Sequence, residues 1–181
     1  MRVTDPILTP RLLLSTLETD AASGPYLGWL ADPVVVRFLE ARHSSQSEES
    51  LRAYIAGAIE SPNTLLLGLH LRSDRRHVGN LKLGPIDRPN RRVEIGLLIG
   101  DAACRGKGFG REAIEAATRY AFEGLDLHKV TAGYIEPNLA SARAFAAAGY
   151  VEEARLRDEY FFEDRWVAHV RLGRIRPPGR S

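Results

Sequence analysis

Apolar residues fall along the chain in short continuous runs and in longer stretches with helical spacing, which are typical of buried strands and amphipathic helices. The first half holds one short run, two helical stretches, and three short runs divided by charged or proline-bearing turns. Strands joined by such turns predict an antiparallel meander. We expect strands over 11–17, 64–71, 77–83 and 92–99, and helices over 18–30 and 47–60. Residues 34–39 follow the Asp32-Pro33 break and are expected as a short turn of helix or as extended chain.

The second half of the chain differs, because its helical stretches alternate with strands. Alanine and aromatic residues recur at helical spacing over 114–125, and another helix is expected over 139–148. Asn138 is the expected N-cap of the latter, and Gly149 stands where a left-handed C-cap would lie. Strands are expected over 130–135, 150–156 and 166–172, with an acidic, aromatic segment 158–164 joining the last two.

This order of elements predicts an α+β fold in a single domain over residues 1–181. We expect a mixed, mostly antiparallel sheet of about seven strands, flanked by about four helices. Residues 1–10 are interpreted as a polar leader, and residues 175–181, which include two prolines, as a loose tail.

Composition and charge argue against several functional classes. The 181 residues are 44% hydrophobic and 27% charged, and 25 basic residues against 23 acidic residues give a net charge of +2. So balanced a charge does not favour a nucleic-acid-binding surface. No apolar run approaches the ~18 residues of a membrane span, so no membrane association is expected.

Neither cysteine nor histidine spacing indicates a metal centre. The five histidines are scattered, and none has the spacing of a metal site, so we expect no metal. Cys104 is the single cysteine, so no internal disulfide can form, and we expect a cytoplasmic protein. Cys104 abuts the glycine-rich stretch described next, and a small buried thiol is favoured there over an acyl-cysteine nucleophile.

One stretch of the chain is distinguished by its glycines. Residues 105–110 read Arg-Gly-Lys-Gly-Phe-Gly and lie between an expected strand and an expected helix. Three glycines in five positions leave backbone N–H groups open to an anion, and the helix that follows adds the positive end of its dipole. Arg105, Lys107 and Arg111 add positive charge. The stretch therefore predicts a seat for a phosphate or pyrophosphate group.

Spacing separates this loop from the common nucleotide-binding loops. A Walker loop requires Gly-Lys followed by Ser or Thr, whereas Gly106-Lys107 is followed by Gly108. A dinucleotide fingerprint requires its third glycine one residue later than Gly110. The pattern Arg-x-x-Gly-x-Gly at 105–110 instead resembles the acetyl-CoA loop of the GCN5-related N-acetyltransferase (GNAT) family.

Other motifs support the resemblance, which covers about residues 11–174. Residues 138–150 run from Asn-Leu-Ala-Ser to Gly-Tyr and resemble the family's Asn-x-x-Ser helix with its closing Gly-Phe or Gly-Tyr. Within the family, the opening Thr-Pro-Arg-Leu-Leu-Leu at 9–14 and the ending over 155–166 are similar to the branch of ribosomal-protein-alanine and spermidine acetyltransferases.

The resemblance implies acetyl-CoA as co-substrate and a sheet that is splayed between its fourth and fifth strands. The pantetheine arm would pair with backbone at the end of the fourth strand, and the pyrophosphate would lie on N–H groups of the loop. The acetyl-CoA contacts implied in this way are Leu97, Leu98, Ile99, Arg105, Gly106, Lys107, Gly108, Phe109, Gly110, Arg111, Asn138, Ser141 and Phe145.

Glu94 is the best candidate for a general base. Attack on a thioester requires a neutral amine, and an alkylamine with a pKa near ~10 must first lose a proton. Glu94 interrupts an otherwise apolar strand, where a partly desolvated carboxylate would have a raised pKa. The alternative is that Glu94 faces solvent or pairs with Arg92.

Ser141 is the candidate for a group that stabilises or protonates the leaving thiolate, and its alternative roles are a second helix cap or a contact with CoA alone. Many family members carry a tyrosine acid at the position of Phe145, and this chain departs from them. Ser141, Tyr150 or a water would then serve as the acid, or none is needed, because a thiolate is an acceptable leaving group.

The resemblance implies transfer of acetyl from acetyl-CoA to a primary amine, such as a protein N-terminus, a polyamine or an amino sugar. A non-catalytic acyl-CoA sensor and a nucleotide-phosphate-binding domain are the alternatives, and a homodimer is a further expectation. The N-terminal half gives no motif for the acceptor. Aromatic residues are expected to wall its pocket beside acidic residues that suit a cationic amine: Tyr26, Trp29, Phe38, Tyr160, Phe161, Phe162, Asp158, Glu159, Glu163 and Asp164.

Overall fold

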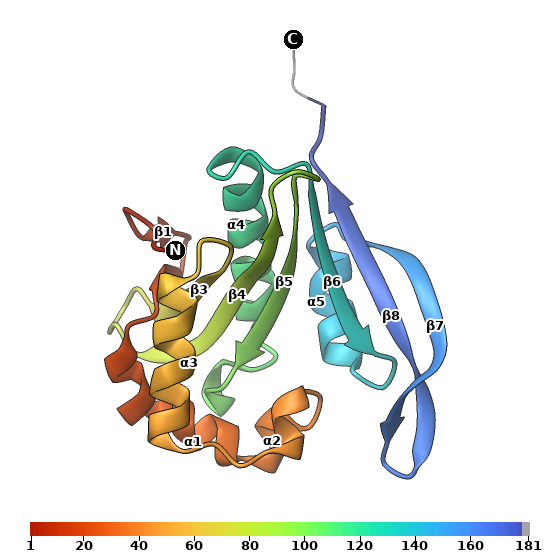
Figure 1. Cartoon of the computed structure of the whole chain (residues 1–181), viewed down its shortest axis with the longest axis horizontal. Coiled ribbons are helices and arrows are strands. Elements are labelled where there is room, and N and C mark those ends of the chain that lie inside the picture. Colours follow the sequence, from red (N-terminus) through yellow and green to blue (C-terminus); the bar gives the residue numbers. More distant parts are fainter. Residues whose placement is uncertain (179–181) are drawn as a thin grey trace.

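The structure is a computed structural model that describes residues 1–178 and shows one long sheet with helices on both faces (Figure 1). The strands are β1 (Ile7–Leu8), β2 (Leu12–Thr16), β3 (Leu65–Leu71), β4 (His77–Asp87), β5 (Arg92–Ile99), β6 (Lys129–Ile135), β7 (Val151–Phe162) and β8 (Arg165–Ile175). The α-helices are α1 (Pro25–Ala31), α2 (Pro33–Val36), α3 (Glu48–Glu60), α4 (Phe109–Glu123) and α5 (Leu139–Ala147). Three short 3₁₀ helices lie at η1 (Thr19–Ser23), η2 (Glu40–His43) and η3 (Ala102–Cys104).

The sheet has the strand order β1-β2-β3-β4-β5-β6-β8-β7, and every neighbouring pair is antiparallel except β5 and β6. This confirms the expected mixed α+β fold. All seven expected strands are present, but the sheet has an eighth, because Ile7 and Leu8 in the expected leader pair with Leu14 and Leu13. A strand of two residues is too short to produce a visible alternation.

The helices of the N-terminal half differ from the expected pattern. The single helix expected over 18–30 is divided into η1 and α1 at Gly24, whose backbone is extended and precedes Pro25 at the first helical position. The Asp32 carboxylate then accepts a hydrogen bond from the Val34 N–H at 2.8 Å and caps α2. These breaks raise the number of α-helices to five rather than the expected four.

The last two strands are longer than expected and absorb most of segment 158–164. β7 continues to Phe162, and β8 begins at Arg165 and reaches Ile175, which was expected in the loose tail. The turn between them consists of Glu163 and Asp164, whose φ angles of 48° and 61° are both left-handed, as in a type I′ hairpin. Residues 179–181 of the expected tail lie outside the described residues.

Apolar side chains on the two faces of the sheet pack under different helices. Leu65 and Leu67 on one face join the large core under α4 and α5, whereas Leu66 on the other face joins a smaller core under α1 and α3. Figure 1 shows α3 and α4 on opposite sides of the sheet. The second core ends at β5, so the face of β6 and β8 on that side has no helix above its middle.

The first turn of α4 is bound to the start of β2 through the carboxylate of Glu112. Its oxygens accept hydrogen bonds from the Thr9 hydroxyl at 2.6 Å, the Arg11 N–H at 2.8 Å and the Arg11 Nε at 2.6 Å. Burial raises the pKa of Glu112, but the bonds from Thr9 and Arg11 lower it further, so its pKa lies below the ordinary value. Arg11 also donates from Nη1 to the Lys107 carbonyl at 2.9 Å and stacks on the Phe109 ring.

Replacing Glu112 with Gln is expected to lower the free energy of unfolding by about 1.5–3 kcal/mol at pH 7, because charge-assisted hydrogen bonds are lost. A carboxyl group with a depressed folded-state pKa stabilises the protein above the unfolded-state pKa, and this contribution disappears as the pH falls through the folded-state pKa. The difference in urea unfolding between wild type and variant should therefore begin to shrink below the unfolded-state glutamate pKa of about 4.3 and disappear at still lower pH.

Glu115→Gln is the matched control on the same helix. Glu115 forms an exposed ion pair with Arg111, which is worth less than ~1 kcal/mol. Equal effects of the two substitutions would contradict the role given to Glu112.

Candidate functional site

The site is centred on a split in the sheet between β5 and β6. These strands pair only over Arg92–Glu94 and Lys129–Thr131, after which β5 continues along β4 and β6 continues along β8. The fourth and fifth expected strands are β5 and β6, so the splay expected between them is present. It opens toward the carboxyl ends of both strands (Figure 1). An irregularity accompanies it, because β4 carries one extra residue opposite Glu94, between Leu83 and Ile86.

The glycine-rich loop follows directly from the open end of β5. Gly106 and Gly108 have φ angles of 72° and 81°, and Gly108 is the N-cap of α4. No backbone N–H from Gly106 to Arg111 donates a hydrogen bond within residues 1–178. Six consecutive free N–H groups and the N-terminus of a 15-residue helix have the geometry that an anion requires, and we call residues 106–111 the anion seat. Its use as a phosphate site stays a prediction. α4 thus begins at Phe109, five residues earlier than expected.

Gly110 has a role in packing that the sequence did not indicate. It lies in the first turn of α4 with an ordinary helical backbone, and a Cβ there would stand 3.3 Å from Leu97 Cδ2. Its missing side chain therefore lets α4 approach β5 closely and brings the loop up to the end of the split.

The three cations of the loop are used differently. Arg105 folds back and donates from Nε to the Ile99 carbonyl at 3.2 Å and from Nη2 to the Gly100 carbonyl at 2.7 Å. Arg111 pairs with Glu115 at 2.8 Å. Lys107 is exposed and has no ion pair among residues 1–178. Lys107 is thus the cation best placed for an incoming phosphate, whereas Arg105 braces the loop.

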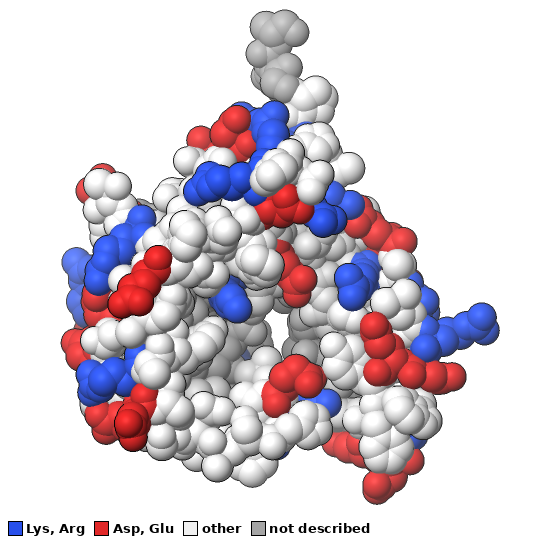
Figure 2. Space-filling model, viewed as in Figure 1, with Lys and Arg blue, Asp and Glu red and all other residues white. Residues whose placement is uncertain are grey.

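Glu94 lies at the apex of the split, as the last residue of β5 that pairs with β6. It is exposed rather than desolvated, and Arg92 pairs with Asp87 at 3.0 Å instead of with Glu94. The expectation that this carboxylate is partly desolvated is therefore wrong, and the alternative that it faces solvent holds. Glu94 faces a cavity of about 560 Å³ lined also by Asp87, Thr131, Gly133, Tyr160, His169 and Arg171. We call this the open-face cavity, and Figure 2 shows the same side of the molecule hollowed near its centre.

The Asn-x-x-Ser helix contributes a cap and a core residue. The Asn138 side chain accepts from the Ser141 N–H at 3.1 Å, so Asn138 is the helix cap that was expected. Ser141 is half-buried. Phe145 is 4% exposed and packs edge-on against Tyr150, with ring centroids 5.1 Å apart. Phe145 is therefore a core residue in this structure.

Tyr150 is not placed to act as the acid. Its hydroxyl is buried and forms a 2.7 Å hydrogen bond with the Thr118 hydroxyl, and burial raises its pKa to about 12. Cys104 is 3% exposed, and burial, followed by the nearby Asp101 charge, raises the pKa of its thiol. A buried, protonated thiol is a poor nucleophile, which agrees with the expected structural role of Cys104.

Only some of the aromatic residues expected at the acceptor pocket lie near the split. Tyr26 and Trp29 both belong to α1, where Tyr26 is buried and the two rings pack against each other. Phe161 and Trp166 form an exposed pair on the β7–β8 hairpin. Phe38 stacks on Phe162 at 5.4 Å, and Tyr160 packs in the same cluster.

An ion pair and this cluster join the N-terminal segment to the β7–β8 hairpin. Arg37, which follows α2, pairs with Glu163 in the hairpin turn at 2.7 Å. The cluster and the ion pair together connect the two halves of the protein where the split is widest, and Figure 1 shows α2 beside the hairpin tip.

His169 is a residue of the cavity that sequence reasoning missed. Its Nδ1 lies 2.8 Å from Glu159 Oε2, and its ring meets the Tyr160 ring edge-on at 5.2 Å. The spacing of the scattered histidines in the sequence gives no sign of this pair, and no cluster that could hold a metal occurs among residues 1–178. The alternation of β8, which places His169 on the same face as Arg171, is the signal that could have identified it.

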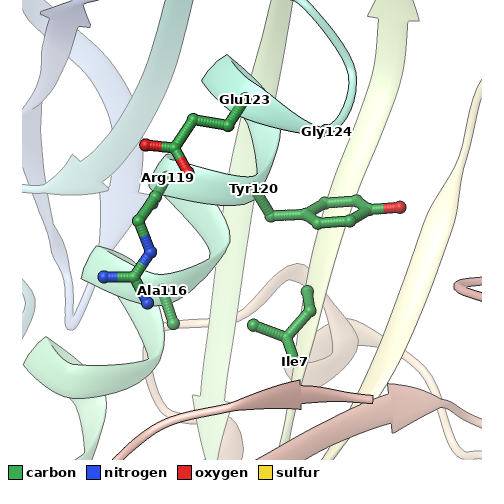
Figure 3. A pocket seen from close by; sticks show the side chains of 6 residues that line it. All are labelled: Ile7, Ala116, Arg119, Tyr120, Glu123 and Gly124. Carbon is green, nitrogen blue, oxygen red and sulfur yellow. The ribbon is translucent and has the colours of Figure 1, made fainter. Parts of the chain in front are cut away.

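A second cavity, of about 340 Å³, lies at the other end of α4 (Figure 3). Arg119 and Glu123 lie on one side of the helix end, Tyr120 points to the other side, and Ile7 approaches from β1. The 15-residue helix separates this cavity from the loop by about 20 Å, so it does not belong to the split.

Fold and site together define an α+β protein with a split sheet and an anion seat at the end of the split. Comparison with known proteins gives this class a name. Residues 11–151 match the family model of the acetyltransferase (GNAT) domain. The chain therefore belongs to the GNAT acetyltransferase family.

Individual relatives agree with this assignment. The chain is 32% identical over 120 residues to the probable N-acetyltransferase YjcK of Bacillus subtilis, with 66% of each chain covered. It is 32% identical over 89 residues to a spermidine N(1)-acetyltransferase of Vibrio cholerae, covering 49% of this chain and 51% of that protein. The match with the [ribosomal protein uS5]-alanine N-acetyltransferase of Escherichia coli is 32% over 89 residues, covering 48% and 45%. The chain thus spans about half to two thirds of these curated relatives.

The fold is also shared with a solved structure. The crystal structure of spermidine N-acetyltransferase from Vibrio cholerae in complex with CoA and spermine has a TM-score of 0.83 and 22% identity, covering 92% of this chain and 96% of that chain. Within residues 1–178, none of the helices is both long and apolar enough to cross a membrane.

The buried thiol leads to a prediction about chemical reactivity. Cys104 in the native protein should react with a disulfide reagent such as dithionitrobenzoate at least 100-fold more slowly than in urea, because it is 3% exposed and its pKa is raised. A native labelling rate close to the unfolded rate would show that the thiol is accessible and would reopen an acyl-cysteine route.

Proposed function

We propose that the protein transfers an acetyl group from acetyl-CoA directly to a primary amine. The observation that carries this proposal is the position of the anion seat. It lies at the open end of a strand whose edge toward β6 is unpaired beyond Glu94. A pyrophosphate on the seat and an extended amide-bearing arm along that edge are the two features that CoA would need.

The donor would be held mainly by backbone groups. The free N–H groups from Gly106 to Arg111 would receive the pyrophosphate, with Lys107 adding a charge. The pantetheine amides would pair with the free edge of β5 at Leu97, Leu98 and Ile99, in the manner of an added strand. Ser141, at the start of α5, would face the CoA sulfur from the β6 side of the split.

The chemistry requires that the amine lose a proton and attack the thioester carbon. The resulting tetrahedral oxyanion would be stabilised by a backbone N–H in the split, and its collapse would expel the CoA thiolate, which then takes a proton. Glu94 at the apex would attract the ammonium form of the acceptor and take its proton, directly or through a water. The acceptor would enter through the open-face cavity.

The acceptor belongs to the class of primary amines, and the relatives suggest where to begin. Named relatives act on spermidine or on a ribosomal-protein alanine, so polyamines and peptides with a free N-terminus form the first test panel. Each amine would be incubated with acetyl-CoA, and free thiol release would be measured. Absence of thiol release with every amine, in protein shown to bind acetyl-CoA, would refute the proposed activity.

Glu94→Gln separates an enzyme from a non-catalytic acyl-CoA sensor. For an enzyme, the substitution is expected to lower kcat/KM for the amine about 10²–10⁴-fold, because general-base catalysis is lost. The Kd for acetyl-CoA should be unchanged in calorimetry. An unchanged thiol-release rate would eliminate Glu94 as the base, and Glu123→Gln at the remote end of α4 serves as the control.

Gly108→Ala tests the anion seat itself. A left-handed φ of 81° costs a non-glycine residue about 1–2 kcal/mol, so the loop should turn its N–H groups away. The Kd for CoA in calorimetry is expected to rise at least ~10-fold. Gly57→Ala, at an exposed helical glycine with open space around it, should leave the Kd unchanged. A similar Kd for all three proteins would argue against the loop as the CoA seat.

A further inference from the structure

We propose that His169, oriented by Glu159, is a second proton acceptor of the site and receives the proton that Glu94 draws from the amine. This inference rests on the proposed acetyl transfer and adds a residue that neither the loop nor the Asn-x-x-Ser helix indicates. His169 lies on β8, which pairs with β6 on the far side of the split from Glu94. It is on the same face of the sheet as Glu94, and both residues line the open-face cavity.

The position of the imidazole follows from the register of three strands. Thr131 of β6 pairs with Glu94, and Gly133 is the next residue of β6 on that face. The His169 ring leans over Gly133, so a Cβ at position 133 would collide with its Nε2. His169 itself pairs with Ile135, and its ring reaches back along β6 to Gly133. Nε2 therefore lies two residues beyond the Thr131–Glu94 pair, and waters in the open-face cavity can connect it with the Glu94 carboxylate.

The hydrogen bond to Glu159 sets the proton on the ring. Nδ1 donates to Glu159 Oε2 at 2.8 Å, so the neutral imidazole carries its free electron pair on Nε2. Nε2 has no hydrogen-bond partner among residues 1–178. The ring therefore presents an acceptor atom to the cavity and a carboxylate behind it that stabilises the imidazolium, which is the arrangement of a histidine base.

A bulge in β7 places Glu159 behind the ring. Leu156 pairs with His169 and Tyr160 pairs with Val167, so three residues of β7 stand opposite one residue of β8. Asp158 within the bulge has a left-handed φ of 52°. Without the extra residues, regular alternation would not bring both Glu159 and Tyr160 against the same imidazole.

The charged and titratable groups around His169 come from every neighbouring element. Glu159 and Tyr160 lie on β7, Arg171 follows on β8, and Glu94 faces the same cavity from β5. Glu40 and Arg42 of η2 act on Tyr160, whose pKa is raised by burial first and then by Glu40 and Glu159. Two carboxylates, Glu159 and Glu94, thus lie around the cavity side of the ring together with the positive charge of Arg171.

The step balances as a proton relay. The ammonium group gives a proton to Glu94, which passes it through waters of the open-face cavity to Nε2 of His169, and the neutral amine attacks the thioester. An imidazole is a stronger base than a carboxylate, so it is the better final acceptor of the proton while the C–N bond forms. The imidazolium then releases this proton to solvent, and the proton lost by the attacking nitrogen ends on the CoA thiolate.

The test compares His169→Gln with wild type across pH, using an amine that wild type acetylates. At pH 7 the variant should lose at least ~100-fold in kcat/KM, with the Kd for acetyl-CoA unchanged. The loss should shrink above about pH 9.5, because the amine then supplies its own neutral form. His128→Gln, at an exposed histidine outside the cavity, is the matched control and should retain full activity.

Two further variants keep the test independent of folding. Glu159→Gln should preserve the melting temperature within a few degrees, lower kcat more than KM, and shift the acidic limb of the pH profile to lower pH. Gly133→Ala should displace the imidazole and reproduce the loss of His169→Gln. A His169→Gln protein within twofold of wild type, or a loss that is the same at pH 7 and 9.5, would overturn the relay while leaving the proposed acetyl transfer intact. Absence of transfer by wild type would overturn both.

Discussion

The structure depends on where β5 and β6 stop pairing. Two parallel strands that share only three residue pairs leave a row of backbone N–H and C=O groups without partners inside the sheet. Each strand keeps its outer neighbour, β4 or β8, so the fold remains continuous while an edge is exposed in its middle. An exposed edge at the centre of a sheet can accept an added strand, and in the function proposed above the extended pantetheine arm takes that place.

The rest of the fold holds this split open at a fixed width. On one side, α4 approaches β5 through Gly110 and is bound to β2 through Glu112, so the anion seat cannot drift from the end of the split. At the wide end, the stacked Phe38 and Phe162 rings and the Arg37–Glu163 pair join the N-terminal helices to the last hairpin. The connections are made by segments far apart in sequence, which is why truncation at either end would affect the site.

Sequence reasoning identified the parts of this design that depend on local chemistry. Apolar runs indicated all seven expected strands, and the glycines of 105–110 indicated a loop with free backbone N–H groups. It placed the start of α4 too late, because Gly108 and Gly110 are poor helix formers on average. Here Gly108 serves as a left-handed cap and Gly110 as a packing gap. It also missed β1, whose two residues make sense only against β2.

The residues of the site also divide into those that local sequence patterns indicate and those that only the folded sheet brings together. The expectation that Glu94 is partly desolvated rested on the apolar residues beside it in the strand, but the helices above β5 end before Glu94, so its face is open. The pairing of His169 with Glu159 depends on a bulge and on left-handed residues in an acidic stretch that looked like a loop. The loop proposed to bind the donor can therefore be predicted from the sequence, because its free backbone N–H groups depend on glycine spacing. The acceptor side cannot, because it is built by register between strands, and register is decided by the folded sheet as a whole.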